Sequence, residues 1–243
     1  MKAHGGGADA AAVFDAAAAE YEAQLARGLS LAGEGRDYFA RGRVDWVARR
    51  LRELGASAGR VLDFGCGDGA AVPLLLGLPG ATSAVGVDVS RESLDRAART
   101  NAGLPASFVE LDRFAPAGDF SLAYCNGVFH HIPLDERDRA ARAVYDALAP
   151  GGLFAFWENN AWNPGTRWVM SRVPFDRDAI PLSPPVARRL LRKAGFEVLR
   201  TDFLFVFPHL LRALRVLEPA LSPLPLGGQF LVLCRRPADG TRA

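Results

Sequence analysis

A glycine-rich turn directly behind a short apolar run is the feature that most limits how this chain can fold. The stretch VLDFGCGDGA, residues 61–70, carries glycines at three alternate positions, Gly65, Gly67 and Gly69. Glycine weakens a regular strand or helix because it adds backbone freedom and no side-chain packing. Three glycines in five residues therefore predict a turn that needs positive φ angles or a close approach of the backbone to a ligand.

Apolar runs typical of strands alternate with amphipathic segments typical of helices along most of the chain. Strands are expected at residues 60–64, 83–89, 106–111, 120–126 and 153–157, and helices at 70–78, 90–102 and 135–150. Repeated strand–helix units of this length predict an α/β fold with a mostly parallel sheet and helices on both faces. Two late strands, at 196–207 and 228–236, are expected to add an antiparallel hairpin at the edge and bring the sheet to seven strands.

Composition sets outer limits on the class of protein. The chain has 243 residues, 49% of them hydrophobic, which is enough for one large core. Its net charge of +2 predicts no strong electrostatic attraction to nucleic acids or to anionic membranes. The cysteines at 66, 125 and 234 lack the paired spacing of a disulfide framework or a metal site, so no metal is expected. We find no signal-peptide pattern and no span-length apolar run, and expect a cytoplasmic location.

The predicted position of the glycine turn indicates a ligand site. In open α/β sheets, ligands bind at the carboxyl ends of the strands, beside helix N-termini. A pyrophosphate-binding turn would follow the pattern G-x-G-x-x-G, whereas here Asp63 precedes the glycines and Asp68 lies among them. Carboxylates repel a pyrophosphate and suit a cofactor with a cationic amino-acid end. Asp88 ends the next strand, where a carboxylate can accept hydrogen bonds from ribose hydroxyls.

Several motifs, in this order, resemble the class I S-adenosylmethionine-dependent methyltransferases over about residues 55–200. They are LDFGCGDG for the glycine turn, GVDVS for the ribose acid, ELDRF for the adenine side, FSLAYCNGVFHHI for the fourth strand and LAPGGLFAF for the fifth. The resemblance is to members that act on small molecules, including sugar and quinone methyltransferases. It implies a Rossmann-like fold and S-adenosylmethionine as the cofactor.

The resemblance also implies which residues surround that cofactor. Asp63, Gly65 and Gly67 would border its methionine end, with Cys66 contributing mainly backbone. The other implied contacts are Asp88 and Val89 at the ribose and adenine, Asp112 at the adenine amino group and Asn126 beside the methionine. For each acid the ordinary alternative is an exposed loop residue or a helix cap, and both roles stay open for Asp68.

Two histidines and an acid are candidates for the chemistry. Transfer of a methyl group to a hydroxyl requires an aligned acceptor and removal of its proton by a positioned base. His130 and His131 follow the fourth strand, and Glu158 ends the fifth, so all three are expected at the ligand edge of the sheet. Some sugar O-methyltransferases that this chain resembles pair a His with an acid at these positions. The alternative is that one histidine packs and caps the turn while Glu158 is a polar strand end.

The remaining segments are expected to control access and contacts. Residues 1–50 are interpreted as a helical cap over the cofactor, and residues 51–243 as the methyltransferase domain with a substrate-loop insertion at 158–184. In that insertion and just before it, Trp157, Trp162 and Trp168 with Arg167 and Arg172 form either an aromatic wall or ordinary loop packing. The helical stripe Leu210, Leu214 and Leu217 is expected to be core or a subunit contact, such as a homodimer interface, rather than a lipid site.

The sequence therefore favours a methyltransferase that acts on O or N of a small molecule, such as a sugar, phenol, quinone or natural product. Two alternatives stay open: a protein that binds the cofactor without methyl transfer, and an NAD(P)-dependent oxidoreductase. A nucleic-acid methyltransferase is disfavoured because the chain has no NPPY-like motif and no basic appended domain.

Overall fold

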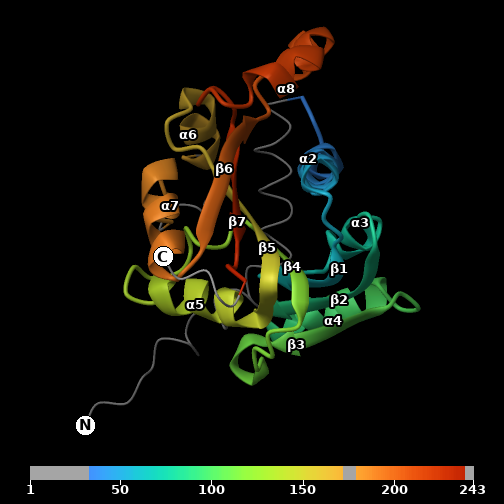
Figure 1. Ribbon diagram of the computed structural model, residues 1–243. Helices are drawn as coiled ribbons and strands as arrows, with labels where there is room; N and C mark the ends of the chain where they lie inside the picture. The colour runs from blue at the N-terminus through green and yellow to red at the C-terminus, as the bar shows by residue number, and fades with distance from the viewer. Residues whose placement is uncertain (1–32, 172–178, 239–243) are drawn as a thin grey trace.

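The computed structural model describes residues 33–171 and 179–238, and its centre is one seven-stranded sheet (Figure 1). The strand order is β3-β2-β1-β4-β5-β7-β6. Strands β1 to β5 run parallel, and β7 pairs antiparallel with both β5 and β6. The predicted mostly parallel Rossmann-like sheet with an antiparallel edge pair is confirmed. The strands are β1 (Gly59–Phe64), β2 (Ala81–Asp88), β3 (Ala106–Glu110), β4 (Phe120–Asn126), β5 (Leu148–Asn159), β6 (Glu197–Leu204) and β7 (Gln229–Arg235).

Helices connect these strands close to where the sequence predicts them. They are α2 (Arg36–Leu54), α3 (Val72–Leu76), α4 (Arg91–Thr100), α5 (Arg137–Ala147), α6 (Pro164–Met170), α7 (Pro184–Lys193) and α8 (Glu218–Leu221), with the 3₁₀ helices η1 (Leu111–Arg113) and η3 (His209–Leu217). Helix α4 has a side-chain N-cap, because Oγ of Ser90 accepts a hydrogen bond of 3.1 Å from the Ser93 amide. None of the helices within residues 33–171 and 179–238 is long and apolar enough to cross a membrane.

The boundary between α5 and β5 differs from the expected one. The predicted helix over 135–150 ends at Ala147, and β5 already begins at Leu148, well before the predicted strand start at 153. Leu148 pairs with Phe120 of β4, and a register shift lies between Phe120 and Leu122. Leu148 therefore joins the sheet before Pro150 and the two glycines, which lie within the register shift, and helix-stop signals alone do not reveal this.

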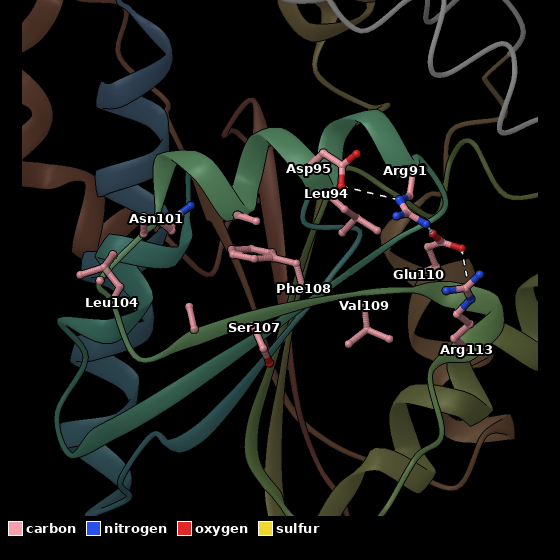
Figure 2. A pocket seen from close by; sticks show the side chains of 14 residues that line it. Arg91, Leu94, Asp95, Asn101, Leu104, Ser107, Phe108, Val109, Glu110 and Arg113 are labelled. Carbon is pink, nitrogen blue, oxygen red and sulfur yellow. Dashed lines mark hydrogen bonds and ion pairs between the residues drawn. The ribbon is translucent and has the colours of Figure 1, made fainter.

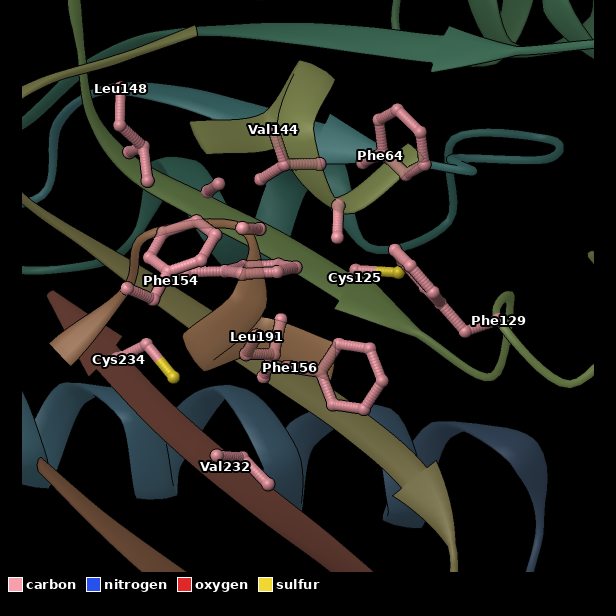
Figure 3. Packing of buried hydrophobic residues seen from close by; sticks show 14 of the residues in the cluster. Phe64, Cys125, Phe129, Val144, Leu148, Phe154, Phe156, Leu191, Val232 and Cys234 are labelled. Atoms are coloured by element: carbon pink, nitrogen blue, oxygen red, sulfur yellow. The ribbon is translucent and has the colours of Figure 1, made fainter. Parts of the chain in front are cut away.

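Apolar side chains pack against both faces of the sheet. On one face α5 and α7 cover a cluster rich in aromatic residues, in which Phe129, Phe154 and Phe156 are fully buried (Figure 3). Cys125 and Cys234 lie in this cluster as apolar side chains, and burial raises the pKa of both thiols. On the other face α2 and α3 pack over residues of β1, β4, β5 and β7. The two layers hold the carboxyl ends of the parallel strands in fixed positions.

A buried carboxylate fixes α2 to the sheet. Asp202 of β6 is fully buried and accepts hydrogen bonds from Nε1 of Trp46 (2.9 Å), Nε of Arg50 (2.8 Å) and Nε of Arg200 (2.9 Å). Helix α2 and the sheet thus share one core, and the expected division between residues 50 and 51 lies inside this helix. Residues 1–32, which hold most of the expected cap, lie outside the described residues.

Removal of the Asp202 charge is expected to loosen this attachment. Asp202→Asn leaves the buried guanidinium of Arg50 with Glu53 but without the fully buried carboxylate, so we expect the free energy of unfolding to fall by about 2 kcal/mol. Asp119→Asn is the matched control, because Asp119 pairs with Arg60 where both side chains are 43% exposed. The control should change stability by less than about 0.5 kcal/mol. Urea titrations of the two variants measure this, and an equal loss of unfolding free energy in both would contradict the role of Asp202.

Candidate active site

The glycine turn sits between β1 and α3 and is held against β2. The amides of Gly65 and Cys66 both donate to the carbonyl of Val87, at 2.7 and 3.1 Å. Gly65 has a φ of +76°, and a Cβ there would lie 2.3 Å from Cγ2 of Val128 in the loop after β4. Gly67 has a φ of +52°, and a Cβ there would meet no protein atom within 4 Å. Gly65 is therefore required by packing, whereas Gly67 faces open space.

Asp88 shapes this turn. Its Oδ2 accepts a hydrogen bond of 2.8 Å from the Gly67 amide, and its Oδ1 accepts one of 3.0 Å from the Ser90 amide. The sequence predicts a ribose contact for Asp88, and the structure adds a backbone-bracing role that it did not predict. Each carboxylate oxygen has two lone pairs, so acceptor capacity for ribose hydroxyls remains.

Asp63 is a buried carboxylate with an unused oxygen. It is 2% exposed at the end of β1, and its Oδ2 has no hydrogen-bond partner within residues 33–171 and 179–238. Burial, together with the negative charges of Asp88 and Asp68, raises the pKa of Asp63 to about 7. A cationic group placed beside it would favour its ionised form.

The other predicted cofactor residues lie along the same edge with different exposure. Cys66 is buried with its Sγ 3.6 Å from the Gly67 carbonyl, and burial raises the pKa of its thiol. Val89 is 39% exposed beyond β2, and Asp112 is exposed on η1 just after β3. Asn126 ends β4, in register with Trp157. The parallel strands thus bring all these residues to one edge of the sheet, as predicted, while their roles stay predictions.

An ion pair that sequence reasoning did not find joins α2 to the turn. The Arg36 guanidinium donates to Asp68, with NH2 2.9 Å from Oδ1 and NH1 3.3 Å from Oδ2. Oδ1 also accepts a 3.3 Å hydrogen bond from the Ala70 amide, so Asp68 braces the turn as well. The partners are 32 residues apart, and no spacing in the sequence signals the pair.

His130 and Glu158 form the closest polar contact at this edge. Nδ1 of His130 lies 2.6 Å from Oε2 of Glu158, and the two residues are 4% and 2% exposed. Oε1 of Glu158 accepts a hydrogen bond of 2.9 Å from the Phe129 amide, which fixes the carboxylate. The His–acid pair expected from the sequence is therefore brought together. Such a pair holds an imidazole in one orientation and stabilises its protonated form.

His131 has a different environment. Its ring lies 4.1 Å from the ring of His130, centroid to centroid, at 48°. Burial and the charge of His130 lower the pKa of His131 to about 3. A group this weakly basic is a poor proton acceptor near neutral pH.

Arg137 supports the histidine loop and was not predicted. This buried side chain donates from Nε to the Ile132 carbonyl (2.9 Å) and from NH2 to the Ile180 carbonyl (2.8 Å). The Ile180 amide in turn donates to the His130 carbonyl at 2.9 Å. Arg137 is the first residue of α5, where a positive charge is unfavourable beside the positive end of the helix dipole. This unusual placement is the one feature of the sequence that could have indicated a structural role for Arg137.

The tryptophans in and before the loop after β5 lie only in part where the predicted aromatic wall requires them. Trp157 is fully buried within β5 and packs in the core on the α2 face, so it is no part of a wall. Trp162 and Trp168 are 50% and 46% exposed on and beside α6. Arg172 lies outside the described residues. The segment 158–184 begins as the end of β5, because strand pairing extends to Asn159.

Residues 61–152 match the family model described as a methyltransferase domain. They cover the glycine turn, Asp88, Asn126 and both histidines. By this match, residues 61–152 form a methyltransferase domain.

Known relatives of the methyltransferase domain agree with this identification. The chain is 32% identical over 98 residues to trans-aconitate 2-methyltransferase of Rhizobium leguminosarum bv. trifolii. The matched segment makes up 40% of this chain and 37% of that protein. The match spans only 24% to 37% of the length of the curated relatives. A solved S-adenosylmethionine-dependent methyltransferase from Mesorhizobium loti is 22% identical with a TM-score of 0.58, covering 79% of this chain and 100% of that one. The cyclase SpnF is 20% identical with a TM-score of 0.57, covering 80% and 81%.

The methyltransferase domain has a cradle that fits S-adenosylmethionine, the cofactor of this family. The unused oxygen of Asp63 is buried where a cationic amino group would satisfy it. The space in front of Gly67 is open, and the carboxylate of Asp88 lies beside the turn. The donor set thus fits a ligand with a cationic amino-acid end.

A hollow of about 400 Å³ elsewhere in the methyltransferase domain is a separate feature. It lies between α4 and β3, and none of the predicted cofactor or catalytic residues lines it (Figure 2). At its rim Glu110 pairs with Arg91 at 2.7 Å and with Arg113 at 3.5 Å. The charged groups there satisfy one another, so we do not place the cofactor in it.

Gly67→Val tests the cradle. A side chain there would enter the open space, and we expect the affinity for S-adenosylhomocysteine to fall about ten- to a hundredfold, as measured by calorimetry. Valine at positive φ also costs about 1–2 kcal/mol of stability. Gly55→Val is the matched control, because Gly55 has a φ of +61° and open space but caps α2. Cofactor affinity lost equally in both variants would show that only backbone strain was measured.

Proposed function

We propose that this protein is an S-adenosylmethionine-dependent methyltransferase that acts on O or N of a small molecule, with His130 as general base and Glu158 as its orienting acid. The observation that carries the proposal is the buried contact of 2.6 Å between Nδ1 of His130 and Oε2 of Glu158. It lies at the sheet edge that carries the glycine turn and Asp88.

The proposed chemistry needs little besides alignment and a proton acceptor. The bound cofactor supplies an electrophilic methyl group, and the acceptor must present a lone pair in line with it. A hydroxyl acceptor loses its proton to the imidazole as the bond forms. Glu158 keeps Nδ1 of His130 engaged, which directs the other ring nitrogen to this task, and its negative charge stabilises the imidazolium.

The environment of the two histidines supports His130 for this role. The pKa of His131, lowered to about 3, leaves it neutral and weakly basic. His130 is the one in contact with a carboxylate. We therefore assign His131 to packing against His130 and to shaping the pocket.

The pair of His130 and Glu158 also indicates which chemical class of methyl acceptor the protein would use. The relatives named for trans-aconitate act on a polycarboxylic acid, whose ionised oxygens need no base. A buried His–Glu pair is of use when the acceptor arrives protonated. We therefore propose an alcohol, phenol or protonated amine as the acceptor group for this chain.

The test is formation of S-adenosylhomocysteine in the presence of the protein, S-adenosylmethionine and separate panels of sugars, phenols, quinones, amines and carboxylic acids. We expect turnover with a hydroxyl or amine panel and its loss on Glu158→Gln. Binding of the cofactor without turnover on any panel would favour the alternative of a cofactor-binding protein without methyl transfer. The cyclase among the structural neighbours shows that the fold alone does not decide this.

A further inference from the structure

Exposed apolar side chains concentrate in the excursion between β6 and β7, residues 205–228. Among the described residues fifteen large apolar side chains are exposed, and seven of them fall within residues 210–226. These seven are Leu210, Leu211, Leu214, Val216, Leu217, Leu224 and Leu226. Single exposed apolar residues are ordinary on protein surfaces, whereas a contiguous group marks a contact surface. We call this group the apolar excursion.

The local geometry explains why these side chains cannot pack as the sequence suggests. Residues 209–217 form the 3₁₀ helix η3 with a kink at Leu211, so the expected α-helical face of Leu210, Leu214 and Leu217 does not form. Side chains three apart align in a 3₁₀ helix. Leu210, Leu214 and Leu217 are 92%, 42% and 49% exposed, so this stripe is not part of the core.

The base of the apolar excursion is firmly attached. The buried carboxylate of Glu218 accepts three hydrogen bonds of 3.1 Å, from the amides of Phe205, Val206 and Phe207. The excursion therefore presents its leucines as a fixed part of the fold. Figure 1 shows η3 and α8 projecting beyond the rest of the described chain at the top of the view.

The charge that the apolar excursion exposes is positive. Residues 205–228 contain Arg212 and Arg215 and a single acid, Glu218, which is buried against backbone amides. Arg215 is held by Glu34, at 2.8 Å, and lies over the ring of Tyr38. Arg212 is exposed and contacts Nε2 of His209 at 2.8 Å. An apolar surface whose one exposed charged side chain is Arg212 complements an anionic apolar partner.

A second copy of the chain is a poorer match for the apolar excursion. A two-fold dimer brings the same patch of both subunits together. Both copies would then bring Arg212 into an interface to which the excursion brings no exposed carboxylate.

The apolar excursion leaves the sheet at the edge that holds the candidate active site. Gln229, which follows it, pairs with Asn159, one residue after Glu158. We propose that the apolar excursion docks the protein on an anionic lipid surface, with Leu210 and Val216 inserted among the lipids. This docking holds independently of the proposed reaction, because it rests on exposed side chains and charge alone.

The test is co-sedimentation of the full chain with vesicles of phosphatidylcholine and with vesicles of equal parts phosphatidylcholine and phosphatidylglycerol. We expect sedimentation with the anionic vesicles, reduced in high salt because surface charges are screened. The double variant Leu210→Asp, Val216→Asp should lower the partition coefficient at least about tenfold. Arg212→Glu should remove the preference for anionic vesicles. Leu104→Asp is the matched control, since Leu104 is 40% exposed at the opposite edge of the sheet, before β3, and it should sediment as the unmodified chain does.

Failure of the unmodified chain to sediment with anionic vesicles would overturn the proposal, as would full sedimentation of the double variant. A dimer in light scattering that the double variant dissociates would also overturn it, because the surface would then be a subunit contact. Circular dichroism of each variant confirms that it is folded before it is scored.

Discussion

His130→Ala is expected to lower the rate of methyl transfer by about 10²–10⁴-fold while leaving the affinity for S-adenosylhomocysteine nearly unchanged. This is the usual contribution of a positioned general base. The cofactor cradle is built from β1, β2 and the glycine turn, so loss of the imidazole after β4 does not remove its contacts. The split between rate and affinity separates a proton-transfer role from a general collapse of the site.

His131→Ala is the matched control for that variant. The two rings are adjacent, at 4.1 Å between centroids, so both substitutions open a similar space. Because the pKa of His131 is lowered to about 3, its loss should change the rate much less. If His131→Ala lost as much rate as His130→Ala, or if both variants and Glu158→Gln kept full turnover, His130 would not be the base.

Asp63 is expected to make stability depend on pH. Its pKa is raised from 3.8 to about 7 in the folded protein, mainly by burial, so the folded state binds more protons than the unfolded state between these values. Burial favours the neutral carboxyl, so Asp63 contributes its full stabilisation of the folded state below about pH 4. It is lost progressively as the pH rises through about 7. Three pKa units correspond to about 4 kcal/mol in total.

Asp63→Asn removes this titration. The difference in unfolding free energy between the variant and the unmodified chain should therefore shift by about 3 kcal/mol in favour of the variant between pH 5 and pH 8. Denaturant titrations at the two pH values measure it. Asp112→Asn is the control, because that carboxylate is exposed on η1 and should give no comparable shift. A constant difference for Asp63→Asn across the range would show that Asp63 is ionised in the folded protein.

The sheet and the gathering of the site could be predicted because both follow from local pattern. Alternating strands and helices give parallel strands, and parallel strands share one carboxyl edge, so Asp63, Asp88, Asn126 and Glu158 had to meet there. Contacts between distant segments could not be predicted. No spacing in the sequence indicates that Asp202 anchors α2 or that Arg36 reaches Asp68.

Where local signals compete, the tertiary contacts decide. Pro150 and the glycines after it end a helix in isolation, yet β5 begins before them because Leu148 pairs with Phe120 of β4. The choice between His130 and His131 depends on burial and on contact with Glu158, and two adjacent letters cannot show either. The leucine stripe of residues 210–217 follows an α-helical period in sequence but lies on a kinked 3₁₀ helix.

Titration calorimetry of the protein with S-adenosylhomocysteine, with NADH as the comparison ligand, tests whether the glycine turn binds this cofactor rather than a nicotinamide. We predict a single site for S-adenosylhomocysteine, no heat of binding for NADH, and an affinity lowered at least about tenfold by Asp88→Ala, which removes the acceptor of the Gly67 amide and the predicted ribose contact. Binding of NADH in preference to S-adenosylhomocysteine, or unchanged affinity of Asp88→Ala, would contradict the account.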